Sequence, residues 1–169
     1  MRPQWPIMLC LFAGPALSAT GDEQSFQNRF AGSWTGGGPV RRNAESPIID
    51  ADCAVTGDHA PNRMSISGSC RGAVVFTRDI SADVTFNPAT GRYTGTYVGA
   101  RAGPATIVGK RNGNRVNFTM TWPKPVNGST RARMSILNDG QGMLRIQVVS
   151  QPQANGPATT LSDLTFRKH

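Results

Sequence analysis

Apolar residues recur at every second position through most of this chain, and this period of two restricts the folds open to it. The segment from 115 to 122 is a clear case, with an apolar set, Val116, Phe118, Met120 and Trp122, and an alternating polar set, Arg115, Asn117, Thr119 and Thr121. Successive side chains of a strand point to opposite faces, whereas a helical face repeats about every 3.6 residues. The alternation therefore predicts strands that are apolar on one face and polar on the other.

Ten segments between Phe30 and Phe166 show this alternation, and turn-forming residues separate several of them. These turns lie at Pro61-Asn62, at Asn87 to Gly91, at Asn112-Gly113 and at Asn138 to Gly140. Short turns of this composition join antiparallel neighbours. We therefore expect an all-β fold, a single antiparallel up-and-down β-barrel or a sandwich of about 8–10 strands.

Two stretches depart from the strand pattern. Residues 23–28 have the composition of a short helix, which would precede the first strand and could close one end of a barrel. The run Gly36-Gly37-Gly38-Pro39 follows a strand but lacks the lysine and the helix of a phosphate-binding loop. We interpret it as a mobile loop at a barrel mouth.

The N-terminus has the layout of a secretory signal peptide. Arg2 precedes an apolar run from Ile7 to Phe12, and small residues follow up to Ala19. The run is far shorter than the ~20 residues that a membrane-spanning helix needs, so no transmembrane helix is expected. We predict a signal peptide over 1–19, a single β-barrel domain over 20–169, and a periplasmic or secreted location in a bacterial cell.

Cleavage would remove Cys10 and leave Cys53 and Cys70 in a compartment where thiols oxidise. A two-residue turn at Pro61-Asn62 would place the two cysteines directly opposite each other on neighbouring strands. A longer loop with a diagonal pairing would also bring them close. Either geometry predicts one local disulfide between Cys53 and Cys70.

Residues suited to catalysis are scattered. The ten acidic residues form no cluster in the sequence, no serine lies in a nucleophile motif, and the two histidines, His59 and His169, have no partners nearby in sequence. Asp79 and Asp83 share a strand face but would lie roughly 13 Å apart, too far for a glycosidase pair. We expect no enzyme activity, no metal site and no cofactor.

Arg78 interrupts an otherwise apolar strand face that runs from Val74 to Phe86. A buried arginine needs an anion, carbonyl groups or an acidic ligand, so a local salt bridge or a strand bend is the alternative to a ligand contact. The other candidate lining residues are apolar or aromatic and adaptable: Tyr93, Tyr97, Met64, Met120 and Met134. We therefore expect the interior either to be filled by its own side chains or to hold a small apolar or acidic molecule.

The chain is basic, with 18 Lys and Arg against 10 Asp and Glu and a formal net charge of +8. Six of these residues are expected on outward faces or turns of neighbouring strands: Lys110, Arg111, Arg115, Arg131, Arg133 and Arg145. Such a basic surface would attract an acidic component of the cell envelope. It could also be a solvated surface without a partner. Nucleic acid is not expected, because no stacking aromatic residues lie beside these positions.

The segment Phe30-Ala31-Gly32-Ser33-Trp34 resembles the Gly-x-Trp signature at the first strand of lipocalins and other calycin barrels. The resemblance implies a barrel with Trp34 at its closed end, an arginine of the last strand, Arg167, packed over that ring, and a ligand inside. An arginine stacked on an indole is a cation-π contact. The threonine-aspartate-tyrosine motif of the family is missing, and ten strands exceed the eight of lipocalins.

Two other functions fit the same pattern. The chain is also similar to small periplasmic inhibitors of secreted metalloproteases, which implies a protein-interaction module whose arm, Thr20 to Gln27, would enter a protease cleft. Alternation alone does not say which face is sheltered. The third possibility is therefore a small outer-membrane β-barrel with its apolar faces on lipid.

Overall fold

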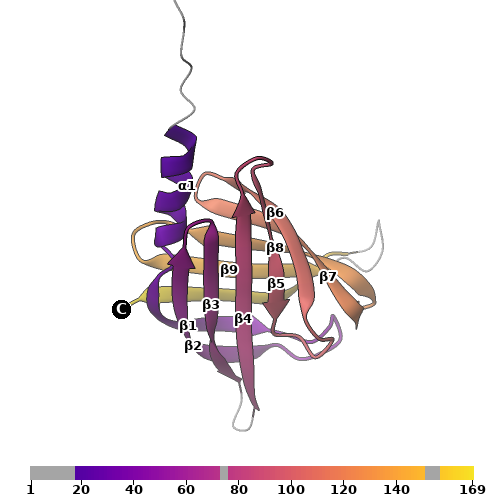
Figure 1. Ribbon diagram of the computed structural model, residues 1–169. Coiled ribbons are helices and arrows are strands. Elements are labelled where there is room, and N and C mark those ends of the chain that lie inside the picture. Colours follow the sequence, from indigo (N-terminus) through magenta and orange to yellow (C-terminus); the bar gives the residue numbers. More distant parts are fainter. Residues whose placement is uncertain (1–17, 73–75, 151–156) are drawn as a thin grey trace, which may run out of the picture.

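The computed structural model describes residues 18–72, 76–150 and 157–169. Residues 1–17 of the predicted signal peptide and Val74 lie outside this part. In it, a helix, α1 (Ser18–Asn28), precedes ten strands (Figure 1). The strands are β1 (Gly32–Val40), β2 (Ile49–Ala60), β3 (Arg63–Gly72), β4 (Phe76–Asn87), β5 (Arg92–Val98), β6 (Ala105–Asn112), β7 (Arg115–Val126), β8 (Ser129–Asn138), β9 (Met143–Ser150) and β10 (Thr159–Lys168).

The strands form a closed antiparallel barrel. Each strand pairs with its neighbours in the chain, and β1 pairs with β10 to close the sheet, with Trp34 opposite Lys168 and Gly36 opposite Phe166. The predicted all-β antiparallel fold is confirmed, as a barrel and not a sandwich. At this coarse level the architecture fits a lipocalin-like barrel, with ten strands in place of eight.

The alternating pattern matches the two faces of the barrel wall. Along β7 exposed and buried residues alternate from Arg115 to Trp122, and the buried set is the apolar one. The alternative with apolar faces on lipid is therefore wrong, because those side chains pack inside the barrel. In the described part of the chain, α1 lacks the length and apolar character of a membrane-spanning helix.

The predicted disulfide joins Cys53 of β2 to Cys70 of β3. The two strands are connected by the two-residue turn Pro61-Asn62, and the register pairs Ala60 with Arg63 and Cys53 with Cys70. Asn62 adopts a positive φ of 61°, which lets two residues reverse the chain. The direct pairing is thus the correct alternative, and the longer loop is not.

One end of the barrel is closed by α1, which Figure 1 shows above the strand ends. The predicted helix is confirmed and begins earlier, at Ser18. Phe26 and Phe30 are fully buried, with their rings 5.3 Å apart in an edge-to-face contact. The half of the barrel below them is filled by large side chains, among them Trp34, Tyr93 and Phe166.

The glycine-rich run belongs to β1 and is not the mobile loop that we expected. A Cβ atom on Gly36 would overlap the carbonyl oxygen of Thr165, and one on Gly37 would overlap that of Ala51. The missing side chains therefore let β10 and β2 approach β1 closely. Glycine is needed here for the close packing of neighbouring strands. The short glycine-rich sequence alone does not distinguish this role from that of a flexible loop.

Candidate functional site

The end of the barrel opposite α1 contains a cavity of about 770 Å³ that opens to solvent. This volume lies within the range of about 300–1,000 Å³ typical of small-molecule sites. The cavity exists because several inward positions near this end carry small residues, including Ala51, Gly72, Ala100 and Ala102. The barrel is therefore packed near α1 and hollow at the other end, which we call the mouth.

The cavity wall is mainly apolar. Side chains from five strands and the disulfide contribute to it: Ile49, Cys70, Ile80, Trp122, Val148, Leu161 and Leu164. A wall of this kind favours binding of the apolar part of a ligand. The bound state is stabilised because apolar surface is transferred out of water.

Arg78 brings a positive charge into this wall. It lies on the inward face of β4, opposite Cys70 of the disulfide, and it is partly buried. The register of β4 with β5 begins at Ser81 opposite Val98, so Arg78 lies beyond the end of β5. The guanidinium therefore belongs to the mouth end of the barrel, beside the loop that follows β5.

Tyr97 of β5 lies on the same cavity wall. Burial raises the pKa of the Tyr97 phenol, and the positive charge of Arg78 opposes part of this shift. A methyl group on Gly99 would overlap the Tyr97 hydroxyl, so the phenol is folded back over the start of the β5–β6 loop. Tyr97 is thus a neutral side chain within the electrostatic reach of Arg78.

Two nitrogen donors of cavity-lining residues lack an acceptor among the described residues. They are Nε1 of Trp122, whose side chain is only 3% exposed, and Nδ2 of Asn127. Buried N–H groups in folded proteins are nearly always paired, and each exception calls for an explanation. Both nitrogen atoms are buried within the protein, so a molecule in the open cavity would not contact them directly.

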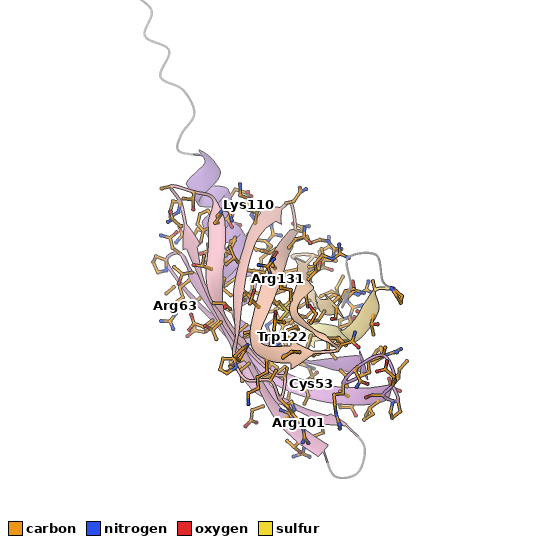
Figure 2. All side chains as sticks on the ribbon, turned by 90° about the vertical axis from the view of Figure 1, so that its right-hand side faces the viewer. Cys53, Arg63, Arg101, Lys110, Trp122 and Arg131 are labelled. Atoms are coloured by element: carbon orange, nitrogen blue, oxygen red, sulfur yellow. A yellow bond between two sulfur atoms is a disulfide. The ribbon has the colours of Figure 1, made fainter. Side chains whose placement is uncertain are left out.

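The rim of the mouth is cationic. Arg41, Arg42, Arg101 and Lys124 line the cavity opening, and no acidic residue is among the described residues that line it. Figure 2 shows Arg101 at the barrel end far from α1, with Lys110 near α1. A cleft lined by charges of one sign raises the local concentration of ligands of the opposite charge.

The β1–β2 loop, residues 41–48, reaches across the mouth. The backbone N–H of Ala44 donates to Oδ1 of Asn127, 2.9 Å away in the β7–β8 turn. The two turns belong to strands that are not neighbours in the barrel. The loop therefore forms a partial cover over the cavity.

Only two of the predicted interior residues reach the cavity. Arg78 and Tyr97 line it, whereas Met64, Met120 and Met134 are buried in the packed half. Tyr93 is also buried there, and its hydroxyl donates to the Glu23 carboxylate of α1. All four have the predicted inward direction, but alternation does not give the depth of a side chain along the barrel, so it does not separate these four residues from the two at the cavity.

Arg111 was predicted on the basic surface but turns onto α1. Its Nε donates to the Glu23 carboxylate at 2.9 Å, and its Nη2 donates to Asp22. The Arg111 side chain is 15% exposed, and its guanidinium lies 5.0 Å from the centre of the Phe26 ring. Arg111 therefore forms ion pairs with two residues of α1 that lie 88 and 89 positions earlier in the sequence. These ion pairs hold the helix against β6.

The remaining basic-surface residues lie on the outside of the barrel. Four are exposed on the neighbouring strands β6, β7 and β8: Lys110, Arg115, Arg131 and Arg133. Arg145 on β9 binds both carboxylate oxygens of Asp163, at 2.7 and 2.6 Å. Its charge is therefore largely compensated within the protein.

The cation over the Trp34 ring is Lys168 and not Arg167. Nζ of Lys168 lies 5.4 Å from the ring centre, and the register pairs the two residues directly. Arg167 lies opposite Thr35, one position further, so alternation turns it to the outer face. Trp34 is buried near the α1 end, and its Nε1 donates to the Phe30 carbonyl oxygen at 2.9 Å.

The inhibitor alternative requires residues 20–27 to be a free arm. In the structure they belong to α1, and Glu23, Phe26 and Gln27 are buried against the barrel. Among the described residues, no three His, Cys, Asp or Glu side chains gather as a metal site requires.

No protein-family model matches this chain, and no curated protein matches it in sequence. The resemblance to calycins thus extends to the closed antiparallel barrel, and membership of that superfamily stays a prediction.

Proposed function

We propose that this chain is an exported, non-enzymatic binding protein whose cavity holds a small amphipathic molecule with an apolar body and an acceptor-rich, anionic head. The observation that carries the proposal is the position of Arg78, a cationic side chain in the wall of a largely apolar cavity that has no acidic residue among its described lining residues.

The apolar wall favours a ligand with a hydrocarbon body. The wall, including Trp122, Val148 and Leu164, would receive the hydrocarbon part of the molecule. Burial of that apolar surface away from water would stabilise the complex.

The charge around the cavity favours an anionic head. Arg78 within the wall and Arg42, Arg101 and Lys124 at the rim are positive, and no described lining residue is negative. A carboxylate that leaves water needs such a partner, because an isolated buried charge is strongly unfavourable. A long-chain carboxylic acid combines both properties and is the simplest molecule of this class.

Two further observations support export. The N-terminal pattern of Arg2, the apolar run and the small residues is that of a secretory signal peptide. The Cys53–Cys70 disulfide suits an oxidising compartment. Fractionation of expressing cells tests this part, since a reduced, full-length protein found only in the cytoplasm would contradict it.

The binding proposal is tested by titrating the purified protein with a dansyl-labelled fatty acid and, separately, with the methyl ester of the same probe. We expect the acid to bind more tightly than the ester. The substitution Arg78→Gln should weaken acid binding about tenfold and reduce the preference for the acid, because it removes one charge-assisted contact.

The ratio of the two affinities is an internal control, because loss of fold would weaken acid and ester alike. Met134→Leu, a conservative change in the packed half of the barrel, is the matched variant and should leave both affinities unchanged. Equal affinity for acid and ester, or no binding of either by folded protein, would show the proposal to be wrong.

A further inference from the structure

The mouth combines exposed positive charge with an exposed apolar side chain. Arg42, Arg101 and Lys124 are exposed and line the opening. Ile48 lies on the same loop as Arg42 and is 58% exposed. Val98, 37% exposed, ends β5 at the same end of the barrel.

Charge is distributed unevenly around the barrel. From Val84 to Asn138 the sequence contains eight Lys and Arg and no Asp or Glu. This stretch forms β5 to β8, including the rim residues Arg101 and Lys124. The described residues of the mouth loops include one acidic residue, Glu45, in the β1–β2 loop.

We propose that the mouth docks on a bilayer that contains anionic phospholipid, with the cavity opening toward the lipid. Basic side chains near such a surface each contribute about fivefold in affinity. An apolar side chain beside them gains from insertion at the boundary between headgroups and acyl chains. If the proposed function holds, the ligand would pass between bilayer and cavity without crossing water.

The exposed side chain of Ile48, which we call the apolar tip, favours an anionic bilayer over other polyanionic partners. Nucleic acids and acidic polysaccharides present phosphate or carboxylate groups to basic side chains but offer little to an exposed isoleucine. Ile48 stands between Pro47 and Ile49, which line the cavity, so the exposed isoleucine and the cavity opening lie at the same end of the barrel. A lipid surface is the partner that complements charge, apolar tip and cavity together.

The test is co-sedimentation of the full-length mature protein with phosphatidylcholine vesicles, with and without phosphatidylglycerol. The mouth variant is Arg42→Glu with Arg101→Glu. The matched control is Arg92→Glu with Lys110→Glu, two exposed residues at the α1 end that change the net charge equally.

We expect the wild type to bind vesicles that contain phosphatidylglycerol and to bind pure phosphatidylcholine much more weakly. The mouth variant should lose more than about 25-fold in affinity, and the control variant less than about threefold. Ile48→Ser should weaken binding about fivefold without a change in charge. Glu45→Gln should strengthen it.

Equal losses in the mouth and control variants would overturn the proposal, because the attraction would then be a general effect of net charge. An unchanged affinity of Ile48→Ser, with a DNA duplex bound as tightly as vesicles, would also overturn it and point to a general polyanion surface. The fatty-acid titration separates the two proposals. Probe binding without vesicle binding refutes docking alone, and vesicle binding without probe binding refutes the proposed function alone.

Discussion

The hydroxyl of Tyr93, on β5, donates a hydrogen bond to the carboxylate of Glu23, on α1, across 70 residues of sequence. Arg111 of β6 binds the other oxygen of the same carboxylate at 2.9 Å. Glu23 is buried, so both partners are needed to compensate its charge away from water. This pair of contacts holds the helix over one end of the barrel, and the cavity lies at the opposite end.

Removal of the Tyr93 hydroxyl should therefore loosen the helix. We expect Tyr93→Phe to reduce the free energy of unfolding by about 2 kcal/mol at neutral pH, because a buried carboxylate loses one donor. Tyr97→Phe is the matched control, since it removes the other tyrosine hydroxyl at the open end. Urea unfolding of the three proteins measures the difference, and equal losses in both variants would contradict the role given to Tyr93.

The stability should also fall at alkaline pH. Burial, and donation to Glu23, raise the pKa of Tyr93 above its usual value of about 10, and burial raises that of Tyr97. Both groups stabilise the fold fully below about pH 10, because the unfolded state loses its protons first as the pH rises. Each should contribute a decrease of about 1.4 kcal/mol per pH unit above that point.

Urea unfolding between about pH 10 and 11 tests this pH dependence. Each single Tyr→Phe variant should show about half of the decrease in unfolding free energy with pH that the two tyrosines cause. A variant that lacks both hydroxyls should show none of that decrease. A wild-type slope that neither substitution changes would assign the alkaline unfolding to other groups, such as the three lysines.

Strand directions, turns and the disulfide could be predicted from the sequence because each depends on neighbours in the chain. The Cys53–Cys70 pairing follows from one two-residue turn and from alternation along two strands. The cavity could not be predicted, because it depends on which residues from distant strands share one level of the barrel. Trp122 shows the difference, since its inward direction is a local property and its unpaired N–H is not.

The disulfide should stabilise the barrel without being needed for its topology. It closes a loop with a sequence separation of 17 within one hairpin. The double variant Cys53→Ala with Cys70→Ala should be less stable by about 3 kcal/mol and still fold. Reducing agent should destabilise the wild type by a similar amount and leave the variant unchanged, as measured by denaturant unfolding. A wild type that keeps its stability after full reduction would contradict this.

Gly36 is predicted to tolerate no side chain. A Cβ atom there would overlap the Thr165 carbonyl oxygen and lie 2.7 Å from the Cα atom of Phe166. Both are backbone atoms of β10, so relief requires the barrel closure to shift. We expect Gly36→Ala to cost more than about 2 kcal/mol.

Gly21→Ala is the control for that substitution. Gly21 lies in α1, where an added Cβ meets no atom within 4 Å, so alanine should stabilise the protein by about 0.5–1 kcal/mol. Thermal unfolding of the two variants compares them directly. A neutral Gly36→Ala would show that β1 and β10 can separate without loss.

The contact over Trp34 gives a prediction that separates this barrel from the calycin pattern. Lys168 Nζ lies 5.4 Å from the indole centre, and Arg167 points to the outer face. Lys168→Met keeps the length and the apolar stem of the side chain and removes its charge. The variant should therefore lose only the cation-π contact, with a decrease of about 0.5–1 kcal/mol in the free energy of unfolding. Arg167→Met should cost less than about 0.5 kcal/mol, as for an ordinary surface position. Denaturant unfolding of both variants measures the order of the two losses, and the reverse order would restore Arg167 as the residue that caps the tryptophan.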